Sequence, residues 1–202
     1  MRPNESVKCT DFPCQDVNKE CYTVPSIEIE SGKIKTLMIS EAPPQDLDDY
    51  FYASKKPFYM QTTAQAFNDA GFKVADMKDV LNLGVYVTTA IKCAKTTYSI
   101  SSKTIENCSF RILENEINLF PETKNILLMG DTAIKAMNCI AKRNIGKSMI
   151  PSGSTYKIRK NEYFYKQIRV FPSYLQTGKS YLIEKSKRKM IAEDIKASLK
   201  YR

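Results

Sequence analysis

Four short apolar segments are spaced along the chain, and each shows little alternation of hydrophobic and polar residues. They are residues 36–40 (TLMIS), 85–91 (VYVTTAI), 125–130 (NILLMG) and 167–171 (QIRVF). A strand that is covered on both faces, as in a parallel sheet between helices, lacks the strict alternation of a half-exposed strand. The pattern therefore predicts four buried strands.

Between and after these segments, apolar residues recur at the spacing of a helix face. The expected helices cover residues 62–70, ending at Gly71; residues 104–120, capped by Ser101-Ser102; residues 132–143, capped by Asp131; and residues 181–201, with Leu182, Met190, Ile191, Ile195 and Leu199 on one face. Alternating strands and helices predict an α/β fold, a three-layer α/β/α sandwich around a central four-stranded, mainly parallel sheet.

The length of 202 residues suits one main domain. We expect residues 1–34 to form an irregular, cysteine-bearing N-terminal extension that packs on the core, and residues 35–202 to form the α/β domain. Residues 156–158 and 163–165 flank the polar residues 159–162, and they are expected to form a hairpin before the last strand.

Basic residues are concentrated in the last third of the chain. The net charge is +9, and residues 141–202 hold 16 Lys and Arg against 4 Asp and Glu. Such asymmetry suits a polyanionic partner such as DNA, because each phosphate that is neutralised releases counterions. A solvated, Lys-rich surface has the same composition, so this interpretation stays open as well.

Histidine is absent, which excludes Ser-His-Asp triads, Cys-His dyads and His-rich zinc sites. No apolar run reaches the length of a membrane span, and the N-terminus lacks an apolar leader. We therefore expect a cytoplasmic, monomeric protein with no membrane partner. In a reducing compartment its six cysteines are expected to serve as ligands before disulfides.

Short motifs follow the predicted strands, at the end of a parallel sheet where ligands bind. In order, they are residues 39–44 (ISEAPP), 56–59 (KPFY), 86–93 (YVTTAIKC), 106–108 (ENC), 129–133 (MGDTA) and 172–174 (PSY) followed by 179–182 (KSYL). Their order and approximate spacing resemble the iron–sulfur-cluster-containing family-4 type of the uracil-DNA glycosylase superfamily. The resemblance runs from about residue 9 to the C-terminus.

That family flips a base out of the duplex and hydrolyses its N-glycosidic bond, so the resemblance implies a DNA-binding base-excision enzyme. It makes Glu41 the motif carboxylate, which would orient water or stabilise the sugar cation, and the acidic residues that follow it are further catalytic candidates. It assigns base binding to three residues. The catalytic candidates are Glu41, Asp46 and Asp48, and the base-binding candidates are Phe58, Thr89 and Ser180.

Two departures from the family pattern predict weak or altered uracil excision. Thr89 stands where the family commonly has an Asn that reads uracil, and a hydroxyl cannot present the paired donor and acceptor of an amide. The histidine that steadies the leaving base aligns with Gly178, or with Leu175 if no insertion precedes it. Lys179, Ser180, Gln176 or Thr177 could substitute for it.

The resemblance also implies a 4Fe-4S cluster bound by four cysteines. Cys93 and Cys108 match the internal ligands of the family, and Cys9 and Cys14 replace its N-terminal pair, with Cys21 as a third candidate. Without the resemblance, four cysteines would suit zinc as well. Cys139 is expected to be a small core residue.

DNA phosphates are expected to bind near the loop that enters the minor groove in the family. The basic residues there are Lys179, Lys185, Lys187, Arg188 and Lys189. Two other functions stay open: a non-catalytic, DNA-binding iron–sulfur relative of the glycosylases, and a metal-stapled module that binds a protein partner.

Overall fold

The computed structural model describes residues 1–201, apart from the side chains of residues 179 and 180. A five-stranded sheet in the order β3-β2-β5-β7-β6 forms its centre. Its strands are β2 (Thr36–Ser40), β3 (Val85–Thr89), β5 (Asn125–Met129), β6 (Tyr163–Tyr165) and β7 (Ile168–Ser173). The first four in space are parallel, and β6 runs antiparallel to β7. Every residue of β2, β3 and β5 is buried, which explains their unbroken apolar pattern.

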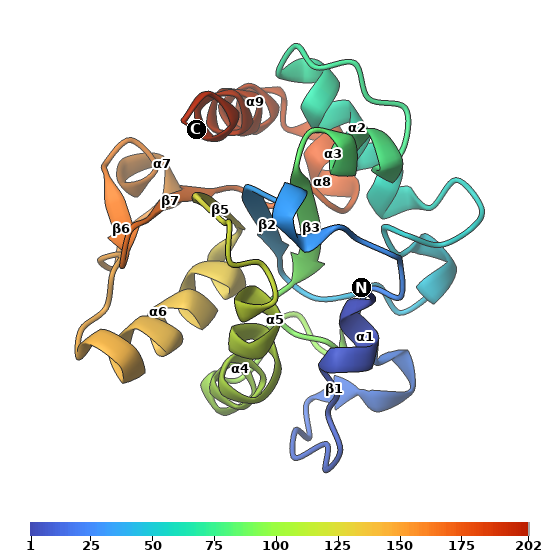
Figure 1. Cartoon of the computed structure of the whole chain (residues 1–202), viewed down its shortest axis with the longest axis vertical. Helices are drawn as coiled ribbons and strands as arrows, with labels where there is room; N and C mark the ends of the chain where they lie inside the picture. Colours follow the sequence, from blue (N-terminus) through green and yellow to red (C-terminus); the bar gives the residue numbers. More distant parts are fainter. Residues whose placement is uncertain (202) are drawn as a thin grey trace.

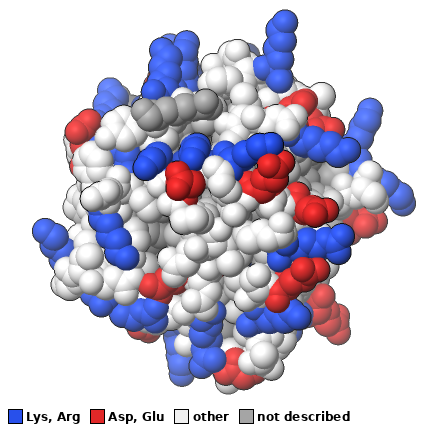
Figure 2. Space-filling view, in the orientation of Figure 1, with Lys and Arg blue, Asp and Glu red and all other residues white. Residues whose placement is uncertain are grey.

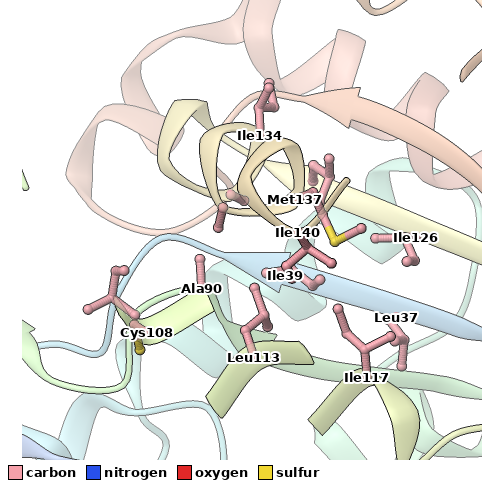
Figure 3. Close-up of a cluster of buried hydrophobic side chains, with 14 of the residues drawn as sticks. Leu37, Ile39, Ala90, Cys108, Leu113, Ile117, Ile126, Ile134, Met137 and Ile140 are labelled. Carbon is pink, nitrogen blue, oxygen red and sulfur yellow. The ribbon is translucent and has the colours of Figure 1, made fainter. Parts of the chain in front are cut away.

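Two layers of helices cover the sheet, as the sequence predicts (Figure 1). One layer contains α4 (Ser102–Cys108), the π-helical segment η4 (Ser109–Leu113), α5 (Glu114–Asn118) and α6 (Asp131–Ile145). The other contains α2 (Phe58–Asp69), α3 (Met77–Asn82), α8 (Lys179–Ile183) and α9 (Lys185–Lys200). Figure 3 shows Ile39 of β2 beside Ile140 of α6, and Leu37 of β2 beside Ile117 of α5. A second apolar cluster, which includes Phe67 and Ile195, packs on the opposite face.

The central sheet has five strands, and the prediction of four is wrong. The fifth strand consists of residues 163–165, which pair with β7 and not with residues 156–158. Residues 156–158 lie in the short helix α7 (Thr155–Ile158), whereas residues 163–165 pair with β7. The turn between β6 and β7 is tight: Tyr165 pairs with Ile168, and Lys166 adopts a φ of 55°. A three-residue strand that depends on such a turn gives little periodic signal.

Helix ends also differ from prediction in two places. Gly130, with a φ of 96°, precedes the first turn of α6, and Asp131 lies inside that turn, where it pairs with Lys135 at 2.7 Å. The predicted closing helix is divided at Glu184 into α8 and α9, and this leaves Leu182 48% exposed. Ser101 does cap α4 by accepting a hydrogen bond from the Thr104 amide at 3.2 Å.

The N-terminal segment packs on the core through buried Val7, Val17, Val24 and Ile29. It contains α1 (Pro3–Ser6), β1 (Val17–Asn18) and the 3-10 helices η1 (Lys19–Cys21) and η2 (Ser31–Lys33). β1 pairs antiparallel with β4 (Ala94–Lys95), which follows β3. A domain boundary at residue 34 stays a prediction. No helix within residues 1–201 is long and apolar enough to cross a membrane.

A buried ion pair joins the C-terminal helix to the rest of the fold. Arg159 contacts both carboxylate oxygens of Asp194, at 3.1 and 2.6 Å, and Ser173 donates to Asp194 at 2.6 Å. The side chains of Arg159 and Asp194 are only 5% and 8% exposed. Burial raises the pKa of Asp194, although hydrogen bonds from Arg159 and Ser173 oppose this effect. The pair therefore holds α9 against the end of β7.

Replacing Arg159 with Met should lower the free energy of unfolding by about 3 to 5 kcal/mol, because it leaves Asp194 buried without its counter-charge. Urea denaturation measures the change, and the double variant Arg159→Met/Asp194→Leu should recover most of it. Lys33→Met, which removes an exposed pair with Glu30, is the control and should change little. An Arg159→Met protein as stable as the natural chain would contradict this role.

Candidate functional site

The carboxyl ends of the four parallel strands lie at one edge of the sheet. Beyond that edge, the segments that follow β2 and β3 continue to form backbone hydrogen bonds with each other. Ser40 of β2 lies opposite Thr89 of β3. The Ala90 amide donates to the Ser40 carbonyl at 2.8 Å, and the Ile91 amide donates to the Glu41 carbonyl at 3.0 Å. These backbone bonds fix Glu41 at the carboxyl edge of the sheet, where ligands bind in open parallel folds.

The Glu41 carboxylate is held on both oxygens. Oε1 accepts a hydrogen bond from Thr132 Oγ1 at 2.9 Å, and Oε2 lies 3.1 Å from Lys95 Nζ. Thr132 is in the first turn of α6, and Lys95 is in β4. The Glu41 side chain keeps 20% of its surface exposed, so a ligand can reach it.

Two aromatic residues, Phe58 and Tyr59, begin α2, and Tyr59 interacts with Glu41. Phe58 is half-buried at the start of α2, and its amide donates to Asp49 Oδ1 at 3.1 Å. Tyr59 is the next residue. Burial raises the pKa of Tyr59, the hydroxyl of Thr177 lowers it, and the carboxylates of Glu41 and Asp49 raise it further. Tyr59 therefore belongs to the site, although the sequence motif gives no reason to assign it a role.

The acidic residues after Glu41 form a short 3-10 helix, η3 (Leu47–Asp49). Asp46 caps it by accepting a hydrogen bond from the Asp48 amide at 3.0 Å, and both residues are exposed. Asp49 is the acidic residue of this group that contacts Phe58. A catalytic role for Asp46 or Asp48 stays a prediction.

Several buried polar atoms face the interior of the same edge. The Ser40 hydroxyl and the carbonyl oxygen of Gln176 are buried and have no hydrogen-bond partner within residues 1–201, whereas the buried Tyr50 hydroxyl interacts with the hydroxyls of Thr88 and Thr89. Thr89 and Gln176 are both 0% exposed. An unsatisfied buried polar group costs free energy, and such groups are rare in folded proteins. Ser40 and Gln176 therefore leave polar atoms at this edge that hydrogen bonds from a ligand would satisfy. Thr89 and Gln176 follow from the motifs, whereas Ser40 and Tyr50 do not.

A buried ion pair between Lys92 and Glu116 lies behind this edge of the sheet. Lys92 Nζ lies 2.5 Å from Glu116 Oε2, and both side chains are 1% exposed. Lys92 also donates to Thr88 Oγ1 at 2.7 Å and to the Thr89 carbonyl. Glu116 Oε1 accepts hydrogen bonds from Tyr86 and Thr88 at 2.6 and 2.8 Å. The network fixes the end of β3, where Thr89 lies.

The four predicted cysteine ligands line one cavity, together with Phe12, Tyr22 and Lys92: Cys9, Cys14, Cys93 and Cys108. Burial raises the pKa of the Cys93 and Cys108 thiols to about 12. Cys21 is outside this lining, and its thiol donates to the Gln45 carbonyl at 3.1 Å. Cys139 packs against the core. Among residues 1–201, no three His, Cys, Asp or Glu side chains form a group that could hold one metal ion.

Of the basic residues predicted to contact phosphates, some already pair with carboxylates of the protein and others are exposed. Arg188 binds Asp69, with the shortest contact at 2.7 Å, and lies over the Tyr181 ring; Lys187 lies 2.6 Å from Glu184. Lys185 and Lys189 are exposed. The side chains of Lys179 and Ser180 lie outside the described residues. In Figure 2, Lys and Arg are spread over the visible face with acidic residues between them.

Comparison with known families agrees with this fold. The model of the uracil DNA glycosylase superfamily matches residues 28–196, which include the whole central sheet and most of α9. None of the curated proteins compared with the chain matches it. Because the family match covers most of the sequence, the chain belongs to the uracil DNA glycosylase superfamily.

Proposed function

We propose that this protein is a DNA base-excision glycosylase that takes a damaged base out of the duplex and hydrolyses its N-glycosidic bond. The observation that carries the proposal is the partly exposed Glu41 carboxylate at the carboxyl edge of the sheet, held by Thr132 and Lys95 and interacting with Tyr59. Enzymes that act on a base extrude it into a pocket with aromatic and hydrogen-bonding walls.

Glu41 supplies the chemistry in this proposal. When the bond to the base breaks, positive charge develops on the sugar, and a fixed carboxylate stabilises it without having to reorganise. The same carboxylate can orient the attacking water. The Thr132 hydrogen bond sets the direction of Glu41 from the start of α6.

Base selection would come from Phe58, Tyr59 and the polar interior. Phe58 offers a face for stacking, which tolerates many bases. Thr89 and Gln176 offer a hydroxyl and an amide in place of the family's Asn and His. The buried Thr89 hydroxyl supplies one donor and one accepting oxygen on the same atom, so it reads the edge of uracil less completely than an amide does. We therefore propose weak or altered uracil activity.

We also propose that the protein belongs to the family-4 type and holds a 4Fe-4S cluster. The four cysteines that line one cavity support this, because a cluster of this kind would be held by four cysteine thiolates. Cys9 and Cys14 come from the N-terminal segment, and Cys93 and Cys108 follow β3 and end α4. The bound group would act as a structural staple between distant parts of the chain.

DNA contact is proposed at α8 and the start of α9. Lys185 and Lys189 are exposed there, and Leu182 and Ile183 in α8 are 48% and 76% exposed. Lysines bind phosphates, and exposed apolar side chains can wedge between base steps in the minor groove. In the sequence, this surface directly follows residues 176 and 177 of the site.

Glu41→Gln should reduce base release by about 10²- to 10³-fold, because the amide cannot stabilise the sugar cation as a carboxylate does. The assay measures single-turnover release from oligonucleotides that contain uracil, hypoxanthine or xanthine. Glu122→Gln is the matched control, since Glu122 also pairs with a lysine, Lys35, at 3.0 Å but precedes β5 at the opposite edge of the sheet.

Full activity in Glu41→Gln would overturn the assignment of this carboxylate. A second candidate function is DNA binding without catalysis, and the engagement of both Glu41 oxygens favours it. Release of no base from any of the three substrates, with DNA binding intact, would select that candidate.

Protein purified without oxygen should be brown and contain about four iron and four sulfide per chain. Cys108→Ala should lose iron and stability together, because binding free energy of a structural metal group is partly folding free energy. Cys139→Ala, in a half-buried cysteine outside the cavity, should keep its iron. One zinc and no iron in the natural protein would replace the cluster with a zinc site.

DNA affinity should fall steeply as salt rises, and the double variant Lys185→Gln/Lys189→Gln should lower the slope of log affinity against log salt by about 2. Titration of a fluorescent duplex at several salt concentrations measures this slope. Lys33→Gln/Lys142→Gln removes the same charge from exposed positions elsewhere and should leave the slope unchanged. Equal slopes for the two double variants would exclude this surface as the phosphate contact.

A further inference from the structure

We propose that the protein has a second activity, in which the Lys95 amine cleaves the DNA strand at an abasic deoxyribose by forming an imine with C1′. This step differs from base hydrolysis, because it acts on the sugar after the base has left. This proposal depends on the proposed function in one respect only, namely that the sugar binds beside Glu41. Lysine amines commonly form such imines with carbonyl substrates.

The pairing of an amine with a carboxylate carries the proposal. Lys95 Nζ lies 3.1 Å from Glu41 Oε2, and the two side chains are 35% and 20% exposed. A sugar whose C1′ lies against Glu41 is therefore close to the amine as well. Thr132 holds the other oxygen of Glu41, so the carboxylate is fixed with its Oε2 against the Lys95 amine.

Lys95 is held more firmly than a surface lysine usually is. Its backbone is in β4 and pairs with Val17 of β1, and its carbonyl accepts a hydrogen bond from Gln45 Nε2 at 2.5 Å. Its Nζ also donates to the Tyr98 carbonyl at 3.4 Å. A nucleophile fixed in this way loses little freedom when it reacts.

Tyr98 adds a surface for DNA beside the amine. Its side chain is 97% exposed, and its ring centroid lies 5.8 Å from Lys95 Nζ. Exposed aromatic rings stack on unpaired bases. An abasic site leaves the opposite base without a partner, and stacking of that base on an exposed ring such as Tyr98 would hold the duplex near the amine. Lys92, by contrast, is buried against Glu116 and is not available to DNA.

The proposed step needs no oxidant or other reagent. Lys95 gives a proton to Glu41, and its amine adds to the C1′ aldehyde of the open sugar to form a carbinolamine. Glu41 then returns the proton to the hydroxyl group of the carbinolamine. Water leaves, and a protonated imine remains. Glu41 next takes a proton from C2′. The electron pair of that C–H bond forms a C2′–C3′ double bond, the C3′–O bond breaks, and the phosphate leaves on the downstream strand. Water then hydrolyses the imine and frees Lys95.

The test uses a synthetic duplex that already contains an abasic deoxyribose, so its outcome does not depend on base release. Borohydride reduces the imine and joins protein to DNA. The natural protein should form this adduct and cut the strand, and peptide mapping should place the adduct on Lys95. Lys95→Arg keeps the positive charge but cannot form the imine, so trapping should fall on the order of 100-fold or more, while affinity for the duplex changes less than about threefold.

Lys35→Arg is the matched control. Lys35 also pairs with a glutamate, at 3.0 Å and with 39% of its side chain exposed, but it precedes β2 at the far edge of the sheet. It should trap as the natural protein does. Glu41→Gln should slow cutting more than trapping, because Glu41 takes the C2′ proton. Absence of an adduct in the natural protein, an adduct mapped to Met1 or another lysine, or undiminished trapping in Lys95→Arg would overturn the proposal.

Discussion

The buried ion pair between Lys92 and Glu116 is the contact on which both candidate sites depend. Two charges that are 1% exposed cost several kcal/mol each to desolvate, so neither is tolerated without the other. Through Lys92 the pair fixes the Thr89 carbonyl and Thr88 hydroxyl at the end of β3. The Lys92 carbonyl also accepts a hydrogen bond from the Thr23 amide at 2.7 Å, which ties down the N-terminal segment. The polar recognition edge and the cysteine cavity therefore share one buried support.

A single short segment connects those two sites. Cys93 lines the cysteine cavity, and Lys95, two residues later, reaches Glu41. Between them, β4 pairs with β1, which lies between Cys14 and Cys21 in the N-terminal segment. Any group held by the cysteines would thus restrain β4 from one side, while Glu41 restrains it from the other. The position of the Lys95 amine follows from both restraints and not from the sheet alone.

The sequence predicts the parts of this structure that arise from local patterns, but not the contacts between distant residues. The four parallel strands follow from unbroken apolar runs, and the shared edge of Ser40 and Thr89 follows from strand order. Residues 163–165 of β6 are predicted as a hairpin strand, but with the wrong partner: residues 156–158 form α7, and β6 pairs with β7 through a turn at Lys166. Glu41, Phe58 and the four cysteines are motif residues, whereas the Glu41–Lys95 pair joins residues 54 positions apart and has no local signal. Tyr59 is missed for a similar reason, since its neighbours Glu41 and Thr177 come from separate loops.

The net charge of this protein overstates the number of cations that are free to contact DNA phosphates. Five cations of the basic last third are engaged within the protein: Arg143 with Glu114, Arg159 with Asp194, Arg169 with Glu162, Lys187 with Glu184 and Arg188 with Asp69. Arg169 also lies 5.1 Å from the ring centroids of Phe164 and Phe171, so its guanidinium supports the sheet edge. A cation that already has a close carboxylate gains less from a phosphate, because it must first give up that contact. The salt dependence of DNA binding should therefore reflect the few exposed lysines near α8 and α9, and be smaller than the total charge of +9 suggests.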